Sequence, residues 1–313
     1  MTWKKSTIDL SHRVSYWTLP PGFNAEFQHL YQRLYQRLHS LNLPPELRQI
    51  FSHNKKFHNI HEGKRCFILA TGPSINKQDL RPLKNEICIA VSAFYLHKDI
   101  KEISPLYHVE APNHEPLQME VPKLYFEGYR KYYSEKTTIF LGHTSYEYSY
   151  FNFLQQNPEF MKDNIHFLNY TASPALDEHN YKNPDLWDIT KPLFRARTVV
   201  YCAIQLAIYM GFKEIYLLGC DFDYLSNLSQ GRTMHFYPLG DDNLDDFNLW
   251  KLNKVTTETF LFEYYVHWKQ YRLMQQYLHS RECYIYNSTE GGLLDVFPRV
   301  SLEDALANKH IKE

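Results

Sequence analysis

Short apolar runs separated by polar turns recur along the chain from residue 65 onward. Each run is rich in β-branched and aromatic residues and is bounded by glycine, proline or small polar residues, a pattern typical of buried strands. Helical patterns lie between several of the runs, and this alternation favours an α/β fold. The expected strands are residues 66–70, 87–91, 106–109, 138–141, 165–168, 214–218 and 283–286.

Two helical segments lie in the second half of the chain. Thr198 is a favourable N-cap for a mostly apolar helix over 199–210, and Gly211 can end that helix. Residues 249–280 have the amphipathic spacing of a long helix or a helix pair. We therefore expect a Rossmann-like, doubly wound and mostly parallel sheet with helices on both faces. Such sheets bind ligands beyond the carboxyl ends of their strands.

The first part of the chain has a different pattern. Residues 23–41 have apolar positions at helical spacing, and a second short helix begins at Pro44-Pro45 and reaches about Phe51. We expect these helices to cap the fold or to contact another copy of the chain. The predicted organisation is a helical N-terminal extension (1–60), a Rossmann-like catalytic domain (61–300) with a lid-like insertion over the acceptor region (142–190), and a C-terminal tail (301–313).

Composition and charge limit the possible binding partners and the cellular compartment. The net charge of −1 gives no reason to expect affinity for nucleic acid or for an acidic membrane. The five cysteines are scattered without CxxC spacing, which is typical of small buried apolar residues in a reduced compartment. The N-terminus lacks the apolar segment of a signal peptide, and no window has the ~20 apolar residues of a membrane-spanning helix. We therefore expect a cytoplasmic protein.

The first candidate site follows the first expected strand, at Thr71-Gly72-Pro73-Ser74. Gly72 allows a sharp bend or a close approach to a ligand, and Pro73 fixes φ. Ser74 can cap a helix whose first amide groups point over the strand end, which is a phosphate-binding geometry. An ordinary strand-to-helix turn explains the same residues. The next two strands end at Ser92 and Glu110, so a ligand crevice along this edge is expected.

A second group of candidates surrounds the apolar helix over 199–210. Arg195 and Arg197 precede its N-terminus, where their charge adds to the helix dipole and suits a phosphate or a carboxylate; surface salt bridges are the alternative. Asp221 and Asp223 follow the next strand and have the spacing of a Mg²⁺ or Mn²⁺ site. Asp221 has the alternatives of capping a loop or binding a ribose or substrate hydroxyl.

Two later positions complete the set. His235 follows a polar loop beyond the same strand and is the best general-base candidate, because an imidazole accepts a proton near neutral pH. Thr289 lies in the polar loop 287–292, whose glycine pair permits close backbone approach to a ligand; a plain turn is the alternative.

The order of these motifs resembles two related groups of proteins. ILATGPSI, IAVSAFYL and RTVVYCAIQLAIYMGFKEIYLLGCDFDY, with a later histidine, are similar to the bacterial sialyltransferases that have one Rossmann domain of GT-A-like type and use a CMP-activated nonulosonate. The opening GKRCFI with GPS and the late TEGG and DVFPRV are similar to a group that includes 6-hydroxymethylpterin diphosphokinases and flagellin-modifying glycosyltransferases. The resemblance covers roughly residues 60–300.

The sialyltransferase resemblance implies roles for individual residues. Gly72-Pro73-Ser74 would face the CMP moiety, Ser92 would bind the donor and Thr198 would lie beside its phosphate or carboxylate. His235 would be the general base for an inverting, metal-independent displacement. The implied catalytic set is Asp221, Tyr224 and His235, and the implied donor-binding set is Thr71, Gly72, Pro73, Ser74, Ser92, Glu110, Arg197, Thr198 and Thr289.

This chain departs from the sialyltransferase pattern at three places. That family has asparagine where Thr71 and Ser92 stand, so the donor hydrogen bonds must differ. Its tyrosine directly follows Asp-Phe and tethers the leaving phosphate, whereas here Asp223 follows and Tyr224 comes one residue later. An acidic group beside a departing phosphate is unfavourable unless a cation intervenes, which keeps a role for a metal open.

Three functions therefore remain open. The first is transfer of a sialic-acid-like sugar from a CMP donor to a hydroxyl of a cell-surface glycan or protein, as in lipopolysaccharide or capsule synthesis, at the inner face of the bacterial membrane or in the cytoplasm. The second is Mg²⁺-dependent pyrophosphoryl transfer with Asp221 and Asp223 as ligands. The third is nucleotide-sugar or glycan binding without catalysis. The helical N-terminal extension and the high aromatic content are compatible with a homo-oligomer as well as with a monomer.

Overall fold

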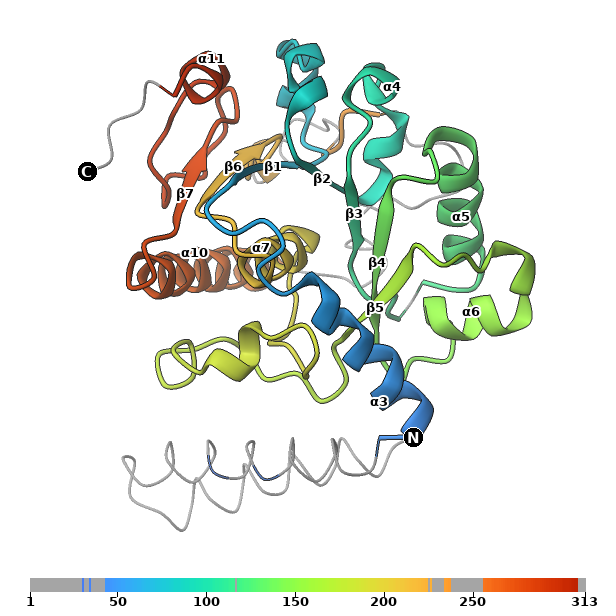
Figure 1. Cartoon of the computed structure of the whole chain (residues 1–313). Coiled ribbons are helices and arrows are strands. Elements are labelled where there is room, and N and C mark those ends of the chain that lie inside the picture. Colours follow the sequence, from blue (N-terminus) through green and yellow to red (C-terminus); the bar gives the residue numbers. More distant parts are fainter. Residues whose placement is uncertain are drawn as a thin grey trace.

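The computed structural model describes residues 43–115, 117–224, 234–237 and 256–308, together with Leu30, Leu34 and Ser226. Its centre is a sheet of parallel strands in the order β5-β4-β3-β2-β1-β6-β7 (Figure 1). The prediction of a Rossmann-like parallel sheet is confirmed, and each expected strand occurs within two residues of its predicted bounds. The strands are β1 Arg65–Leu69, β2 Cys88–Val91, β3 Tyr107–Glu110, β4 Thr138–His143, β5 Ile165–Asn169, β6 Glu214–Leu218 and β7 Tyr284–Asn287.

Helices connect the strands and cover both faces of the sheet (Figure 1). The α-helices are α3 Pro45–Ser52, α4 Ile100–Ile103, α5 Glu120–Tyr132, α6 Tyr150–Gln156, α7 Val199–Tyr209, α10 Thr257–His279 and α11 Leu302–Leu306. The 3₁₀ segments are η1 His53–Phe57, η2 Pro73–Lys77, η3 Arg81–Asn85, η4 Ser92–Leu96, η5 Pro158–Phe160 and η6 Pro184–Trp187.

The strand order defines where a ligand crevice can open. From β1 the chain builds the sheet in one direction as far as β5, then returns through α7 to place β6 on the other side of β1. The pair β1–β6 is therefore the switch point of the sheet, with Leu69 opposite Leu218 at its carboxyl end. In open parallel sheets, the connections diverge at this point and leave room for a ligand.

Alternating side chains of the strands feed two separate cores. In β1, Cys66 and Ile68 pack on the face covered by α7 and α10, while Phe67 and Leu69 pack on the opposite face. Helix α7 is apolar almost all round because it is buried between the sheet and α10. Thr198 caps it by accepting a hydrogen bond from the Val200 amide at 3.4 Å, as predicted.

Other sequence predictions can be compared with the same structure. The short helix expected from Pro45 is α3, and the long amphipathic helix is α10, which begins after the N-cap Thr256; residues 249–255 lie outside the described part. All five cysteines are buried and unpaired, as expected. Leu30 and Leu34 are helical and exposed, and the remainder of the helix predicted over 23–41 lies outside the described residues. The proposed domain bounds stay predictions.

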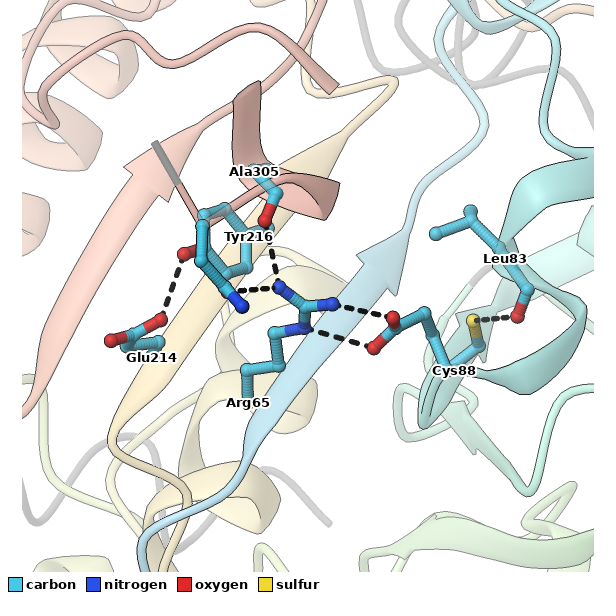
Figure 2. Close-up of polar contacts among 8 residues, drawn as sticks. Arg65, Leu83, Cys88, Glu214, Tyr216 and Ala305 are labelled. Atoms are coloured by element: carbon cyan, nitrogen blue, oxygen red, sulfur yellow. Dashed lines mark hydrogen bonds and ion pairs between the residues drawn. The ribbon is translucent and has the colours of Figure 1, made fainter. Parts of the chain in front are cut away.

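The amino edge of the sheet is closed by a polar network around Arg65, the first residue of β1 (Figure 2). Its guanidinium donates to both carboxylate oxygens of Glu86, at 2.9 and 2.6 Å, and to the Ala305 carbonyl at 2.7 Å. Beside it, the Tyr216 hydroxyl donates to Glu214 at 2.9 Å. The network ties α11 and the start of β2 to the central strand. In the described part of the chain, no helix is long and apolar enough to cross a membrane.

Candidate functional site

Polar residues gather along the carboxyl edge of the sheet. Because every strand pairing is parallel, all strands end on this edge. The sequence-predicted residues on it are Thr71 after β1, Ser92 after β2, Glu110 at the end of β3, Asp221 after β6 and Thr289 after β7. Helix α7 leads into β6 and runs against the strand direction, so Thr198 at its N-terminus belongs to the same edge.

The turn after β1 is packed directly on the turn after β6. The Gly72 amide donates to the Gly219 carbonyl at 2.9 Å. A Cβ atom on Gly72 would lie 2.5 Å from that carbonyl oxygen and 2.6 Å from Cγ of Asp221, so no other residue fits without displacement of the backbone. Gly72 is therefore required by the close approach of the two strand ends.

Asp221 is bound to Ser74 through both carboxylate oxygens. The Ser74 amide donates to Oδ2 at 2.9 Å, and the Ser74 hydroxyl donates to Oδ1 in a shorter bond. Burial raises the pKa of Asp221, while these two bonds lower it. The prediction that Ser74 caps a helix is wrong, because its hydroxyl serves Asp221 and the segment that begins at Pro73 is the short 3₁₀ segment η2.

These contacts bear on the predicted metal site. A Mg²⁺ ion held by Asp221 and Asp223 would have to displace Ser74 from both oxygens of Asp221. Among the residues that the structure describes, no group of three His, Cys, Asp or Glu side chains could hold a metal ion. The role of Asp221 and Asp223 as metal ligands stays a prediction. The observed role of Asp221 agrees with the alternative in which it caps a loop.

His235 lies at the carboxyl end of β1. Its Nδ1 is 2.9 Å from the Thr71 hydroxyl, and the next residue, Phe236, donates its amide to the Thr71 carbonyl at 2.8 Å. The His235 ring also stacks on Tyr237 with 5.1 Å between ring centroids. Residues 234–237, which we call the His235 segment, thus pass directly over the turn that holds Gly72. The role of His235 as a base stays a prediction.

Arg197 is paired with a residue that the sequence patterns did not indicate. Its Nη1 forms an ion pair with Glu263 of α10, and the two side chains are 22% and 33% exposed. The Arg197 Nε is buried and has no hydrogen-bond partner within the described ranges. An anion at the N-terminus of α7 would therefore compete with Glu263 for Arg197. Arg195, by contrast, is exposed.

Thr289 and Tyr224 occupy different environments near the end of β6. Thr289 is buried, and its hydroxyl accepts the Cys220 amide at 3.0 Å, so it fastens the loop after β7 to the end of β6. The Tyr224 ring is partly buried and lies 5.7 Å from that of Phe222 and 6.2 Å from that of Tyr264 in α10. The catalytic and donor-binding roles predicted for these residues are not tested by these contacts.

Backbone strain also marks this edge. Ser92, Ala172 and Phe222 follow the ends of β2, β5 and β6, and have φ values of 49°, 56° and 52°. L-residues disfavour these angles, and such strain persists where the surrounding structure or a function requires it. The prediction that Ser92 contacts a ligand is consistent with this geometry.

Glu110 is the most deeply buried of the acidic candidates, at 4% exposed. Its Oε1 accepts the Ala111 amide at 3.2 Å, and its Oε2 lies 3.4 Å from the Tyr129 hydroxyl. Burial raises the pKa of Glu110 to about 8 and lowers the pKa of His108 to about 3. Although His108 Nε2 is 3.6 Å from Glu110 Oε2, burial disfavours the charged pair, so both groups are uncharged at neutral pH.

Comparison with solved structures finds sialyltransferases with a related fold. CstII of Campylobacter jejuni with cytidine-5'-monophosphate is 17% identical over 77% of this chain and 86% of its own, with a TM-score of 0.43. CstII with a trisaccharide acceptor and CMP is 18% identical over 76% and 86%, with a TM-score of 0.43. The α-2,3-sialyltransferase Cst-I of Campylobacter jejuni is 16% identical over 76% and 80%, with a TM-score of 0.42. At these identities the likeness is one of fold.

Comparison with protein families finds a match over most of the sheet. The family described as 6-hydroxymethylpterin diphosphokinase MptE-like matches residues 39–227, which include β1 to β6 and α7. No curated protein matches the chain. The resemblance to the group that includes 6-hydroxymethylpterin diphosphokinases, inferred from the motifs, is thus confirmed. The chain belongs to the MptE-like family.

Proposed function

We propose that this protein is a sialyltransferase-like glycosyltransferase. It transfers a nonulosonate from a CMP-activated donor to a hydroxyl of a cell-surface glycan or glycoprotein, with inversion at the anomeric carbon. The observation that carries the proposal is the imidazole of His235 beside Thr71, at the carboxyl end of β1 next to the switch point. A group that can accept a proton thus lies where a doubly wound sheet binds its ligand.

The reaction needs a base and a leaving group. The acceptor oxygen attacks the anomeric carbon, its proton moves to Nε2 of His235, and the bond to the CMP phosphate breaks with its electron pair going to the phosphate oxygen. If the Nδ1–H of His235 donates to Thr71, the ring is held in the tautomer whose Nε2 can accept that proton. Thr71 thereby orients the base.

The edge also offers groups for the anionic donor. Arg197 precedes the N-terminus of α7, so the donor's carboxylate or phosphate has a cation and the positive end of the helix dipole to bind there. Gly72 and Ser92 line the neighbouring strand ends. No step in this reaction requires a metal, because hydrogen bonds and Arg197 stabilise the charge of the leaving CMP.

The family description favours one alternative, Mg²⁺-dependent pyrophosphoryl transfer. The contacts of Asp221 weigh against it, since the carboxylate that would hold the metal is already bound by Ser74. The third function, binding without catalysis, predicts CMP affinity without turnover.

The test is a transfer assay with CMP-activated nonulosonates and a panel of glycan acceptors. We expect turnover that EDTA does not reduce, and a loss of about 10²- to 10⁴-fold in kcat for His235→Ala. His53→Ala is the matched control, because His53 is exposed in η1 and should retain full activity. Loss of turnover in EDTA, or a fully active His235→Ala variant, would refute the proposed mechanism.

A further inference from the structure

The face of the sheet opposite α7 carries a layer of tyrosines around one buried acid. Tyr129 of α5 and Tyr133, directly after this helix, stack at 5.8 Å, and their hydroxyl groups lie 3.0 and 2.8 Å from the two ring nitrogens of His108. Tyr95 stands edge-on to Tyr129 at 5.7 Å. Gly128 makes this packing possible, since a Cβ there would lie 2.4 Å from the Tyr95 ring. Glu110 lies at the end of β3 within this layer.

The tyrosine layer connects Glu110 to the His235 segment. Tyr237, whose ring stacks on that of His235, packs against the apolar cluster that contains Tyr95 and Tyr129. Tyr237 also interacts electrostatically with Tyr125, the α5 residue one turn before Tyr129. The segment that presents His235 to the carboxyl edge therefore rests on the layer around Glu110.

Among the residues that the structure describes, none that shifts the pKa of Glu110 is a cation. The titratable groups that face Glu110 are His108 of β3, Tyr95 of η4, Tyr125 and Tyr129 of α5, Tyr133 directly after α5, Tyr150 of α6 and Cys202 of α7. Burial raises the pKa of each of these tyrosines and of Cys202, and lowers that of His108, so all are uncharged near neutral pH. A carboxylate at position 110 would lack a counter-charge and would disrupt the hydroxyl network.

We propose that Glu110 is a positioning residue, whose buried carboxyl group holds the tyrosine layer on which the His235 segment rests. The inference depends on the proposed function, because the geometry it maintains is that of the proposed base. This positioning role differs from the donor-binding role expected for Glu110, because the carboxyl group is turned into the tyrosine layer and bonds to the Tyr129 hydroxyl and the Ala111 amide.

The experiment compares Glu110→Gln and Glu110→Ala with the wild type over pH 6 to 10. Glutamine imitates the uncharged acid, so Glu110→Gln should keep the neutral-pH rate and should not show the decline in kcat that we expect for the wild type above about pH 8. Glu110→Ala should lower kcat by about tenfold or more with little change in the KM for the donor. An alkaline decline that is the same in Glu110→Gln and the wild type would overturn the proposal.

A second measurement is independent of turnover. The Glu110 pKa is higher in the folded than in the unfolded protein, so its stabilising effect is complete below about pH 4.5 and is lost as pH rises through about 8. The melting temperature of Glu110→Gln should therefore increasingly exceed that of the wild type between these values. A melting-temperature difference between Glu110→Gln and the wild type that stays constant with pH would refute the positioning role, even if no transfer activity is found. A fully active His235→Ala variant would refute only the proposed function.

Discussion

Single side chains at the carboxyl edge join segments that are distant in the sequence. Thr71 binds His235 through its hydroxyl and Phe236 through its carbonyl, and Ser74 binds Asp221 across 147 residues. Both side chains are short enough to fit beneath a turn, and their hydroxyl groups form hydrogen bonds with the residues there. The candidate site is thus assembled from short side chains on strand ends, with His235 placed above them.

Thr71→Val tests whether the hydroxyl orients the proposed base. Valine keeps the shape of threonine but cannot hydrogen-bond to Nδ1, so the imidazole loses the partner that selects its tautomer. We expect kcat to fall by about tenfold, which corresponds to one hydrogen bond of about 1.4 kcal/mol, with the KM for the donor little changed. Thr71→Ser retains the hydroxyl and should keep most of the activity. Equal rates for the two variants would contradict an orienting role.

Helices α7 and α10 meet at the site through an ion pair and a set of rings. Glu263 pairs with Arg197, and the Tyr264 hydroxyl donates to the Phe222 carbonyl at 3.0 Å. Helix α10 therefore supports both the N-terminus of α7 and the loop after β6. Its N-terminal half was expected only to be amphipathic, but its Glu263 carboxylate competes with any anion for the site proposed at Arg197.

Glu263→Gln should strengthen donor binding. The change removes the carboxylate that competes with an anionic ligand for Arg197. Because both side chains are partly exposed, the pair contributes at most about 1 kcal/mol, so the KM for the donor should fall by up to about fivefold. Glu258→Gln, an exposed residue in the first turn of the same helix, is the control for net charge. A KM that is unchanged or raised in Glu263→Gln would show that Arg197 does not bind the donor.

The network around Arg65 and the candidate site lie at opposite edges of the sheet. At the amino edge, Arg65 joins β1 to Glu86 and α11; at the carboxyl edge, the strand ends carry the polar candidates. This arrangement follows from an all-parallel sheet, in which every strand begins on one edge and ends on the other. A substitution at the amino edge can then change stability without altering the site.

Arg65→Met tests this separation. The substitution leaves Glu86 without its partner and releases the Ala305 carbonyl, so we expect a loss of about 1–3 kcal/mol in the free energy of unfolding measured with urea, at unchanged kcat/KM. Arg81→Met removes the pair of Arg81 with Asp79, which is exposed on the surface, and should leave stability unchanged. Similar destabilisation by the two variants would contradict a special role for the Arg65 network.

The sequence by itself determined the strands, the helices α3, α7 and α10, and the edge on which the candidates lie. These features follow from local periodicity and from caps such as Thr198, which depend on neighbouring residues. Only the tertiary structure decided which candidates meet. Ser74 was predicted to cap a helix but bonds to Asp221, and Arg197 pairs with Glu263, 66 residues later in the sequence. Burial favours the uncharged form of Glu110. Such pairings depend on long-range packing, and the charge of a buried group depends on its loss of solvent, neither of which a local pattern records.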